Sequence, residues 1–75
     1  MSKAFVLINA QMGAEAEVLN AVSQIPEVKE AHLVYGVYDI ITIVEAYTMQ
    51  ELKDAISLKI RRIDKVRSTI TMIVL

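Results

Sequence analysis

Residues 28–46 read VKEAHLVYGVYDIITIVEA, two segments rich in strand-forming residues that meet at Gly36. The first segment, Val28 to Tyr35, alternates between two faces, and the second, Asp39 to Ala46, is rich in isoleucine and apolar on both faces. A glycine between two such segments is typical of a hairpin turn. The stretch therefore predicts two paired strands, the second of which is covered on both sides.

A helix is predicted on each side of this hairpin. Before it, apolar residues from Ala14 to about Ile25 recur as one stripe of an amphipathic helix, and Pro26 ends the helix because the residue before a proline avoids the α region. After it, Thr48 and Glu51 have the spacing of a capping box, which opens a second helix. The inward-facing residues of the first helix are Val18, Leu19, Val22 and Ile25. Those of the second helix are Leu52, Ala55, Ile56, Ile60 and Ile63.

One more strand is predicted near each end of the chain, at Ala4 to Ala10 and at Val66 to Leu75. The first is apolar on both faces. On the last strand, we expect one face to carry Val66, Ser68, Ile70, Met72 and Val74. The order βαββαβ predicts a single α+β domain over residues 1–75, a ferredoxin-like sandwich with an antiparallel sheet of order 4-1-3-2. In that order the first and third strands, which are apolar on both faces, are central.

The composition predicts self-association. A chain of 75 residues buries only about 60% of the surface that its unfolded form exposes, so a lone domain of this size is marginally stable. No cysteine is present to add a disulfide, and 55% of the residues are hydrophobic. Two helices cover only one face of the sheet, and a second copy is the simplest cover for the other. We therefore expect a dimer formed by sheet-to-sheet packing, an α/β barrel-like assembly, and larger rings are possible.

Charge and residue content exclude several classes of function. Eight Lys and Arg against nine Asp and Glu leave no basic surplus for direct binding of nucleic acid, and the basic stretch Lys59 to Arg62 is interpreted as the cationic end of a helix. No apolar run approaches the roughly 20 residues of a membrane span and no signal peptide is recognised, which predicts a cytoplasmic protein. His32 is the single histidine. We therefore expect no metal, no cofactor and no enzymatic activity.

The predicted topology brings three polar segments to one end of the sheet, namely the end of the first strand, the hairpin and the start of the last strand. Gly36 can adopt a positive φ and let a ligand approach the backbone, Tyr35 and Tyr38 offer aromatic walls, and Asp39 can accept hydrogen bonds from an ammonium group. The hydroxyls that can donate to a carboxylate are those of Ser68, Thr69 and Thr71. Together these groups suit a free amino acid. The alternative is ordinary turn chemistry, in which the glycine and the aspartate only shape the hairpin.

Four segments, in this order and spacing, resemble the ligand-binding domain of the Lrp/AsnC feast/famine transcriptional regulators, also called the domain for regulation of amino acid metabolism. They are Ala4 to Ile8, Ile25 to Val28, Val34 to Ile41 and Val66 to Thr71, and the third, with its Gly-x-Tyr-Asp turn, is the most specific. The resemblance covers nearly the whole chain.

The resemblance implies a βαββαβ domain that dimerises through its sheet and assembles into octamers or related rings, with amino acid effectors bound at the boundaries between dimers. Carried onto this sequence, the ligand-binding residues are Tyr35, Gly36, Val37, Tyr38, Asp39, Ser68, Thr69 and Thr71. Full members of the family place a DNA-binding helix-turn-helix domain before this one, and none is expected here. Regulation of transcription would then act through a partner such as a full-length Lrp/AsnC regulator. A ligand-free assembly module of the same fold is the alternative function.

Overall fold

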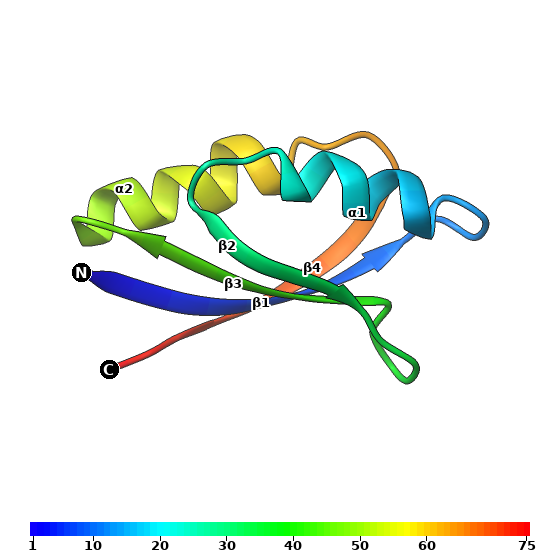
Figure 1. Ribbon diagram of the computed structural model, residues 1–75, viewed down its shortest axis with the longest axis horizontal. Helices are drawn as coiled ribbons and strands as arrows, with labels where there is room; N and C mark the ends of the chain where they lie inside the picture. The colour runs from blue at the N-terminus through cyan, green and yellow to red at the C-terminus, as the bar shows by residue number, and fades with distance from the viewer.

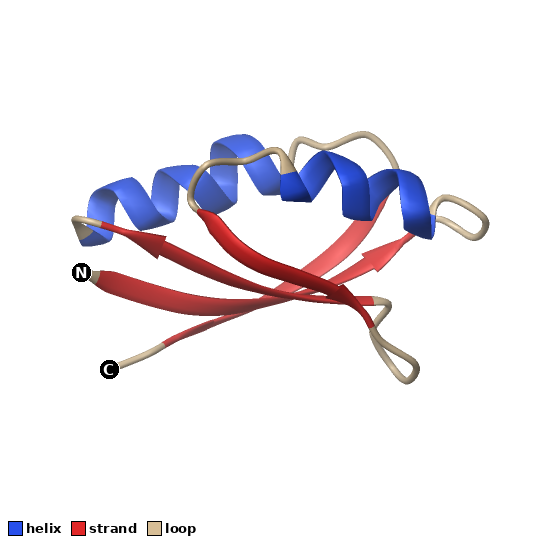
Figure 2. Cartoon of the chain, in the orientation of Figure 1, coloured by secondary structure: helices blue, strands red, loops and turns tan.

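A four-stranded antiparallel sheet carries both helices of the molecule on one of its faces (Figures 1 and 2). The computed structural model describes residues 1–75. The elements are β1 (Ser2–Ala10), α1 (Glu15–Ser23), β2 (Val28–Leu33), β3 (Ile40–Ala46), α2 (Met49–Asp54), the π-helix η1 (Ala55–Ile60) and β4 (Val66–Ile73). The sheet order is β2-β3-β1-β4, which confirms the predicted ferredoxin-like α+β fold with β1 and β3 at its centre.

The register of the central strands decides which side chains share a face. Val6 of β1 lies opposite Thr42 of β3 on one side and Thr71 of β4 on the other. Directly opposed residues of an antiparallel pair point to the same face of the sheet. Thr42 is fully buried there, and its hydroxyl donates to the Val6 carbonyl oxygen at 3.0 Å, so its polar group is satisfied.

The core lies between this covered face and the helices. Alternate residues of β1 and β3 are buried in it, and the apolar stripes of the helices meet them, as the periodicity predicts. Fully burying one large aliphatic side chain contributes about 1.5–3 kcal/mol, so these contacts dominate the stability of the domain. The largest fully buried aliphatic side chains are Ile8, Ile40, Leu52 and Ile60, followed by Val6, Val18, Val22 and Val44.

The second helix begins as predicted and then widens. Thr48 is its N-cap, and the Thr48 hydroxyl oxygen accepts from the Glu51 N–H at 3.1 Å. From Ala55 the helix continues as η1, and the Arg61 N–H donates to the Ile56 carbonyl oxygen at 3.0 Å, a bond from residue i+5 to residue i. Such wide turns are rare within helices and are frequent at functional sites. No pattern in the sequence predicted this one.

The other face of the sheet has no helix over it (Figure 2). It presents an apolar surface in which Ile70 and Met72 are 45% and 48% exposed. Residues that are opposed across the strands make up this open face: Phe5, Leu7, Ile41, Ile43, Ile70 and Met72. An apolar sheet face without a cover is typical of an interaction surface.

Two predicted details are corrected by the structure. β2 ends at Leu33, so Tyr35 lies in the turn and is not the last residue of the strand. Asn9 of β1 lies opposite Ser68 of β4, and the next residue, Ala10, lies opposite Val66. Arg67 is therefore an extra residue of β4 and forms a bulge. Because a shift of one residue reverses the face, Val66 packs against the core while Ser68 lies on the open face. The prediction that these two residues share a face was wrong.

Candidate functional site

Asp39 is held at the end of the sheet where the β2–β3 turn meets β1. Its N–H donates to the Ile8 carbonyl oxygen at 3.0 Å, and its carbonyl oxygen accepts from the Val34 N–H at 2.8 Å. Its carboxylate oxygen Oδ2 accepts from the Ala10 N–H at 2.9 Å. The side chain thus continues the ladder between β3 and β1, and Asp39 belongs to both the sheet and the turn.

A hollow of about 280 Å³ lies beside this carboxylate. It is lined by Asn9, Ala10, Met12, Glu15, Val37, Asp39 and Arg67. Arg67 enters it from the β4 bulge. The ion pairs of the chain are His32–Glu30, Lys59–Glu27 and Lys65–Glu17, so neither Asp39 nor Arg67 takes part in one. The hollow therefore combines two carboxylates, those of Asp39 and Glu15, with the guanidinium group of Arg67, and none of the three is in an ion pair.

The structure places only part of the predicted site at this hollow. Val37 and Asp39 line it, and the Asn9 amide donates to the Ser68 hydroxyl oxygen at 3.5 Å, which places Ser68 next to the lining. Tyr35 projects fully into solvent, and neither Gly36 nor Tyr38 lines the hollow.

The backbone at Gly36 differs from the predicted one. Gly13 is the glycine with a positive φ, and Gly36 is not. A Cβ added at Gly36 would also meet no atom within 4 Å. Nothing within a single chain therefore requires glycine at this position, and the predicted positive φ was wrong. The close approach of a ligand to this backbone stays a prediction.

Thr69 and Thr71 lie on the covered face of β4, opposite to that of Ser68. The Arg61 Nε–H donates to the Thr69 hydroxyl oxygen at 3.2 Å, and the Thr71 hydroxyl oxygen is buried without a partner in the chain. Thr71 is paired with Val6, several positions along the sheet from the Asp39 turn. The eight predicted residues therefore divide into a turn group beside the hollow and a threonine group near η1.

Sequence reasoning missed three polar residues of the hollow, Asn9, Glu15 and Arg67. The expectation that the end of β1 and the start of β4 meet at the hairpin was a signal for Asn9 and Arg67, because both lie in those segments. The bulge in β4, however, could not be predicted from the sequence, and Arg67 enters the hollow from it. No local pattern indicated Glu15, which enters from the first turn of α1.

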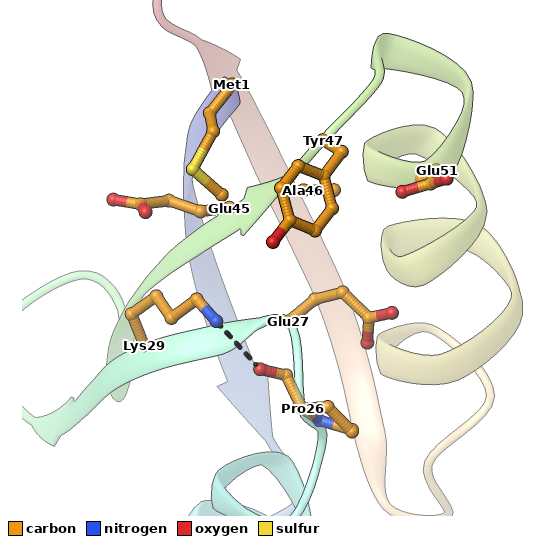
Figure 3. Close-up of a pocket in the computed structure, with 8 residues that line it drawn as sticks. All are labelled: Met1, Pro26, Glu27, Lys29, Glu45, Ala46, Tyr47 and Glu51. Atoms are coloured by element: carbon orange, nitrogen blue, oxygen red, sulfur yellow. Dashed lines mark hydrogen bonds between the residues drawn. The ribbon is translucent and has the colours of Figure 1, made fainter.

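A second hollow lies at the other end of the sheet, near the N-terminus (Figure 3). Three carboxylates and Tyr47 surround it, and the Lys29 amine donates to the Pro26 carbonyl oxygen at 3.2 Å. The Lys59 amine lies 2.9 and 3.0 Å from the two carboxylate oxygens of Glu27. This hydrogen bond holds the pKa of Glu27 below its ordinary value. One acid of this hollow is therefore already paired within the chain.

The relatives of the chain identify its class. Residues 3–75 match the family model described as the Lrp/AsnC ligand binding domain. The chain belongs to the Lrp/AsnC family. Family membership confirms the resemblance and places the chain among ligand-binding regulatory domains, which are not enzymes.

Individual Lrp/AsnC relatives agree with this assignment. A curated protein of Pyrococcus abyssi, the uncharacterized HTH-type transcriptional regulator PYRAB01370, is 36% identical over 70 residues, which are 93% of this chain and 44% of that protein. The chain therefore spans less than half the length of this curated relative. The crystal structure of FFRP-DM1 is 43% identical with a TM-score of 0.95, and each chain covers 100% of the other. That of the hypothetical protein PHS023 from Pyrococcus horikoshii is also 43% identical, with a TM-score of 0.93, and covers 100% of this chain and 90% of that one.

No helix-turn-helix lies within the 75 residues, which the Lrp/AsnC ligand-binding fold fills. None of the helices is long and apolar enough to cross a bilayer.

Proposed function

We propose that the hollow beside Asp39 binds a free amino acid, and that the chain acts as a cytoplasmic, oligomerising effector module in the regulation of transcription. The observation that carries this proposal is the pair of unpaired opposite charges, Asp39 and Arg67, that line one hollow. A zwitterion presents the complementary pair, an ammonium group and a carboxylate.

Asp39 and Arg67 each suit one of the two charged groups of an amino acid. Asp39 uses Oδ2 to accept from Ala10, which fixes the side chain and leaves Oδ1 free to accept from an ammonium group. The Arg67 guanidinium can donate two parallel hydrogen bonds to a carboxylate. The volume of about 280 Å³ is at the lower end of ligand sites, which favours a small molecule such as a single amino acid.

Completion of the site by other copies of the chain is part of the proposal. The Thr69 and Thr71 hydroxyls lie on the covered face, away from the turn, so they reach an amino acid at Asp39 only from a neighbouring copy. The open apolar face supports a dimer by sheet-to-sheet contact, and the exposed turn supports contacts between dimers in an octamer or similar ring. Mixed assembly with a full-length Lrp/AsnC regulator would link the module to DNA.

A likeness in fold also supports an amino acid ligand. The transcriptional regulator NMB0573 of Neisseria meningitidis was solved as a complex with L-Met, and its structure has a TM-score of 0.84 with this one at 17% identity. The fold is thus compatible with an amino acid ligand.

The second candidate is a ligand-free assembly module. It is favoured by the apolar side chains exposed at the turn, because Val37 is 85% exposed and Tyr35 is fully exposed in the single chain. In this alternative the turn only builds contacts between copies.

Calorimetry with each of the common amino acids tests the proposal. We expect at least one amino acid to bind, and both Asp39→Asn and Arg67→Gln to weaken that binding by about tenfold or more, since each removes a charged hydrogen bond. Arg62→Gln removes the same charge from an exposed position that lines no hollow, and serves as the matched control. Absence of binding by every amino acid, with the oligomer intact, would favour the assembly module.

A further inference from the structure

The hollow beside Asp39 carries a surplus of negative charge. Its charged residues are Asp39, Glu15 and Arg67, and none of them is in an ion pair. Two carboxylates against one guanidinium group leave a net charge of −1. The ammonium and carboxylate groups that all amino acids share match Asp39 and Arg67, so Glu15 has no counterpart in a neutral zwitterion. A ligand with a second cation supplies that counterpart.

Glu15 lies in the first turn of α1, and its surroundings differ from those of Glu17, the other acid of that turn. The Glu15 Oε2 oxygen accepts from the Gly13 N–H at 3.4 Å, which places the carboxylate beside the loop between β1 and α1 and leaves Oε1 free. Glu17 is exposed, accepts from the Lys65 amine at 3.1 Å and lines no hollow. The helix dipole explains an acid in this turn. It does not explain a half-buried carboxylate that faces a hollow without a cation of its own.

The two carboxylates of the hollow come from different elements. Figure 1 shows that the start of α1 and the β2–β3 turn lie at the same end of the sheet. Glu15 enters from the helix and Asp39 from the turn, and Met12 and Val37 add apolar side chains to the lining. A cation on an unbranched carbon chain can bury its methylene groups along apolar side chains while its charge reaches a carboxylate. The hollow therefore offers one acid to each of two cations on a single ligand.

We infer that the hollow selects an amino acid with a cationic side chain, such as lysine or arginine, and that Glu15 recognises the side-chain cation. This inference rests on the proposed function, in which Asp39 and Arg67 bind the ammonium and carboxylate groups of the ligand. It adds the class of amino acid and the residue that determines it. A neutral side chain leaves Glu15 without a partner, and an acidic side chain adds a third carboxylate, so both are disfavoured.

Calorimetry with L-lysine, L-arginine and L-norleucine, at pH 7 and constant ionic strength, tests this inference on the full chain. Norleucine has the carbon chain of lysine without the side-chain ammonium group, and all three ligands share the same zwitterion. We expect lysine or arginine to bind about tenfold or more tightly than norleucine, since the cation adds a charged hydrogen bond. Equal affinities overturn the inference and leave the proposed function standing. If none of the three binds, the inference is overturned, and the proposed function fails with it only if the other amino acids do not bind either.

Three variants assign the preference to a residue. Glu15→Gln keeps an oxygen that can accept from Gly13, and it should weaken binding of the cationic amino acid by about tenfold while leaving norleucine unchanged. Asp39→Asn should weaken both ligands alike, because both present the same ammonium group to it. Glu17→Gln removes the same charge from the same helical turn, outside the hollow, and should leave the preference unchanged. Equal loss on Glu15→Gln and Glu17→Gln would show general attraction, and equal loss of both ligands on Glu15→Gln would show a structural role. Either result overturns the inference.

Discussion

The Asp39 carboxylate accepts a hydrogen bond from the backbone N–H of Ala10 at 2.9 Å, across the junction between the β2–β3 turn and the end of β1. The same residue is bonded through its own N–H to the Ile8 carbonyl oxygen at 3.0 Å. Two bonds of one residue therefore close the end of the central strand pair. They also fix the direction in which the carboxylate faces the hollow.

This contact predicts that Asp39 has a structural role that is separable from its charge. Asp39→Ala leaves the Ala10 N–H without its acceptor in a part-buried place, and we expect it to lower the free energy of unfolding by about 1–3 kcal/mol. Asp39→Asn keeps an oxygen that can accept from Ala10, and its effect should be smaller. Urea denaturation followed by circular dichroism measures both. Equal stability of the alanine variant and the wild type would contradict the structural role.

The two glycines should respond differently to alanine. Gly13 has a φ of +86°, where an L-residue with a Cβ is strained, so Gly13→Ala should destabilise the fold by about 1 kcal/mol. Gly36 has no positive φ and open space around it, and Gly36→Ala should leave thermal stability unchanged or slightly raised.

Gly36→Ala then tests whether a ligand or another copy approaches the turn. If stability is kept but amino acid binding or ring assembly is lost, the glycine is required by something outside the single chain. If both are kept, the turn makes no close contact at this position.

The open face of the sheet should be the dimer interface. Ile70 is 45% exposed on that face, and Ile70→Glu places a charge where a second copy would pack. We expect light scattering to show the wild type as an oligomer and this variant at the 8.4 kDa of one chain. Leu58→Glu is the matched control, because Leu58 is similarly exposed, at 54%, on the π-helix η1. A wild type that is monomeric at micromolar concentration would contradict the sheet-to-sheet dimer.

The Glu27–Lys59 pair should make stability depend on pH in the acid range. The Lys59 hydrogen bond lowers the pKa of Glu27 in the folded chain below the ordinary value of 4.5. The stabilisation is therefore fully present above pH 4.5 and is lost as the pH falls through the lowered folded pKa. Both side chains are partly exposed, so we expect a contribution of only about 0.2–1 kcal/mol at neutral pH.

A double-mutant cycle of Glu27→Gln and Lys59→Gln measures this coupling. The coupling energy should be measurable at pH 7 and should disappear below the folded pKa of Glu27. A coupling that stays constant over that range would show that the contact is not ionic.

The sequence by itself determined the elements and their order. Pro26 ends the first helix region, the Thr48 cap opens the second helix, and the apolar periods of β1 and β3 place them at the centre of the sheet. These signals are local, since each depends on a few neighbouring residues and on the backbone geometry that they favour. The polar character of the turn at Asp39 was readable in the same way.

Only the tertiary structure decided which polar side chains lie on the same surface of the molecule. The bulge at Arg67 lies where that residue lines the same hollow as Asp39, and it places Val66 and Ser68 on opposite faces of the sheet. A bulge arises from pairing between strands that are distant in the sequence, and a shift of one residue reverses every face beyond it. The prediction that the hydroxyls of Ser68, Thr69 and Thr71 act together therefore could not be judged from the sequence, because the face of each residue depends on the strand with which it pairs.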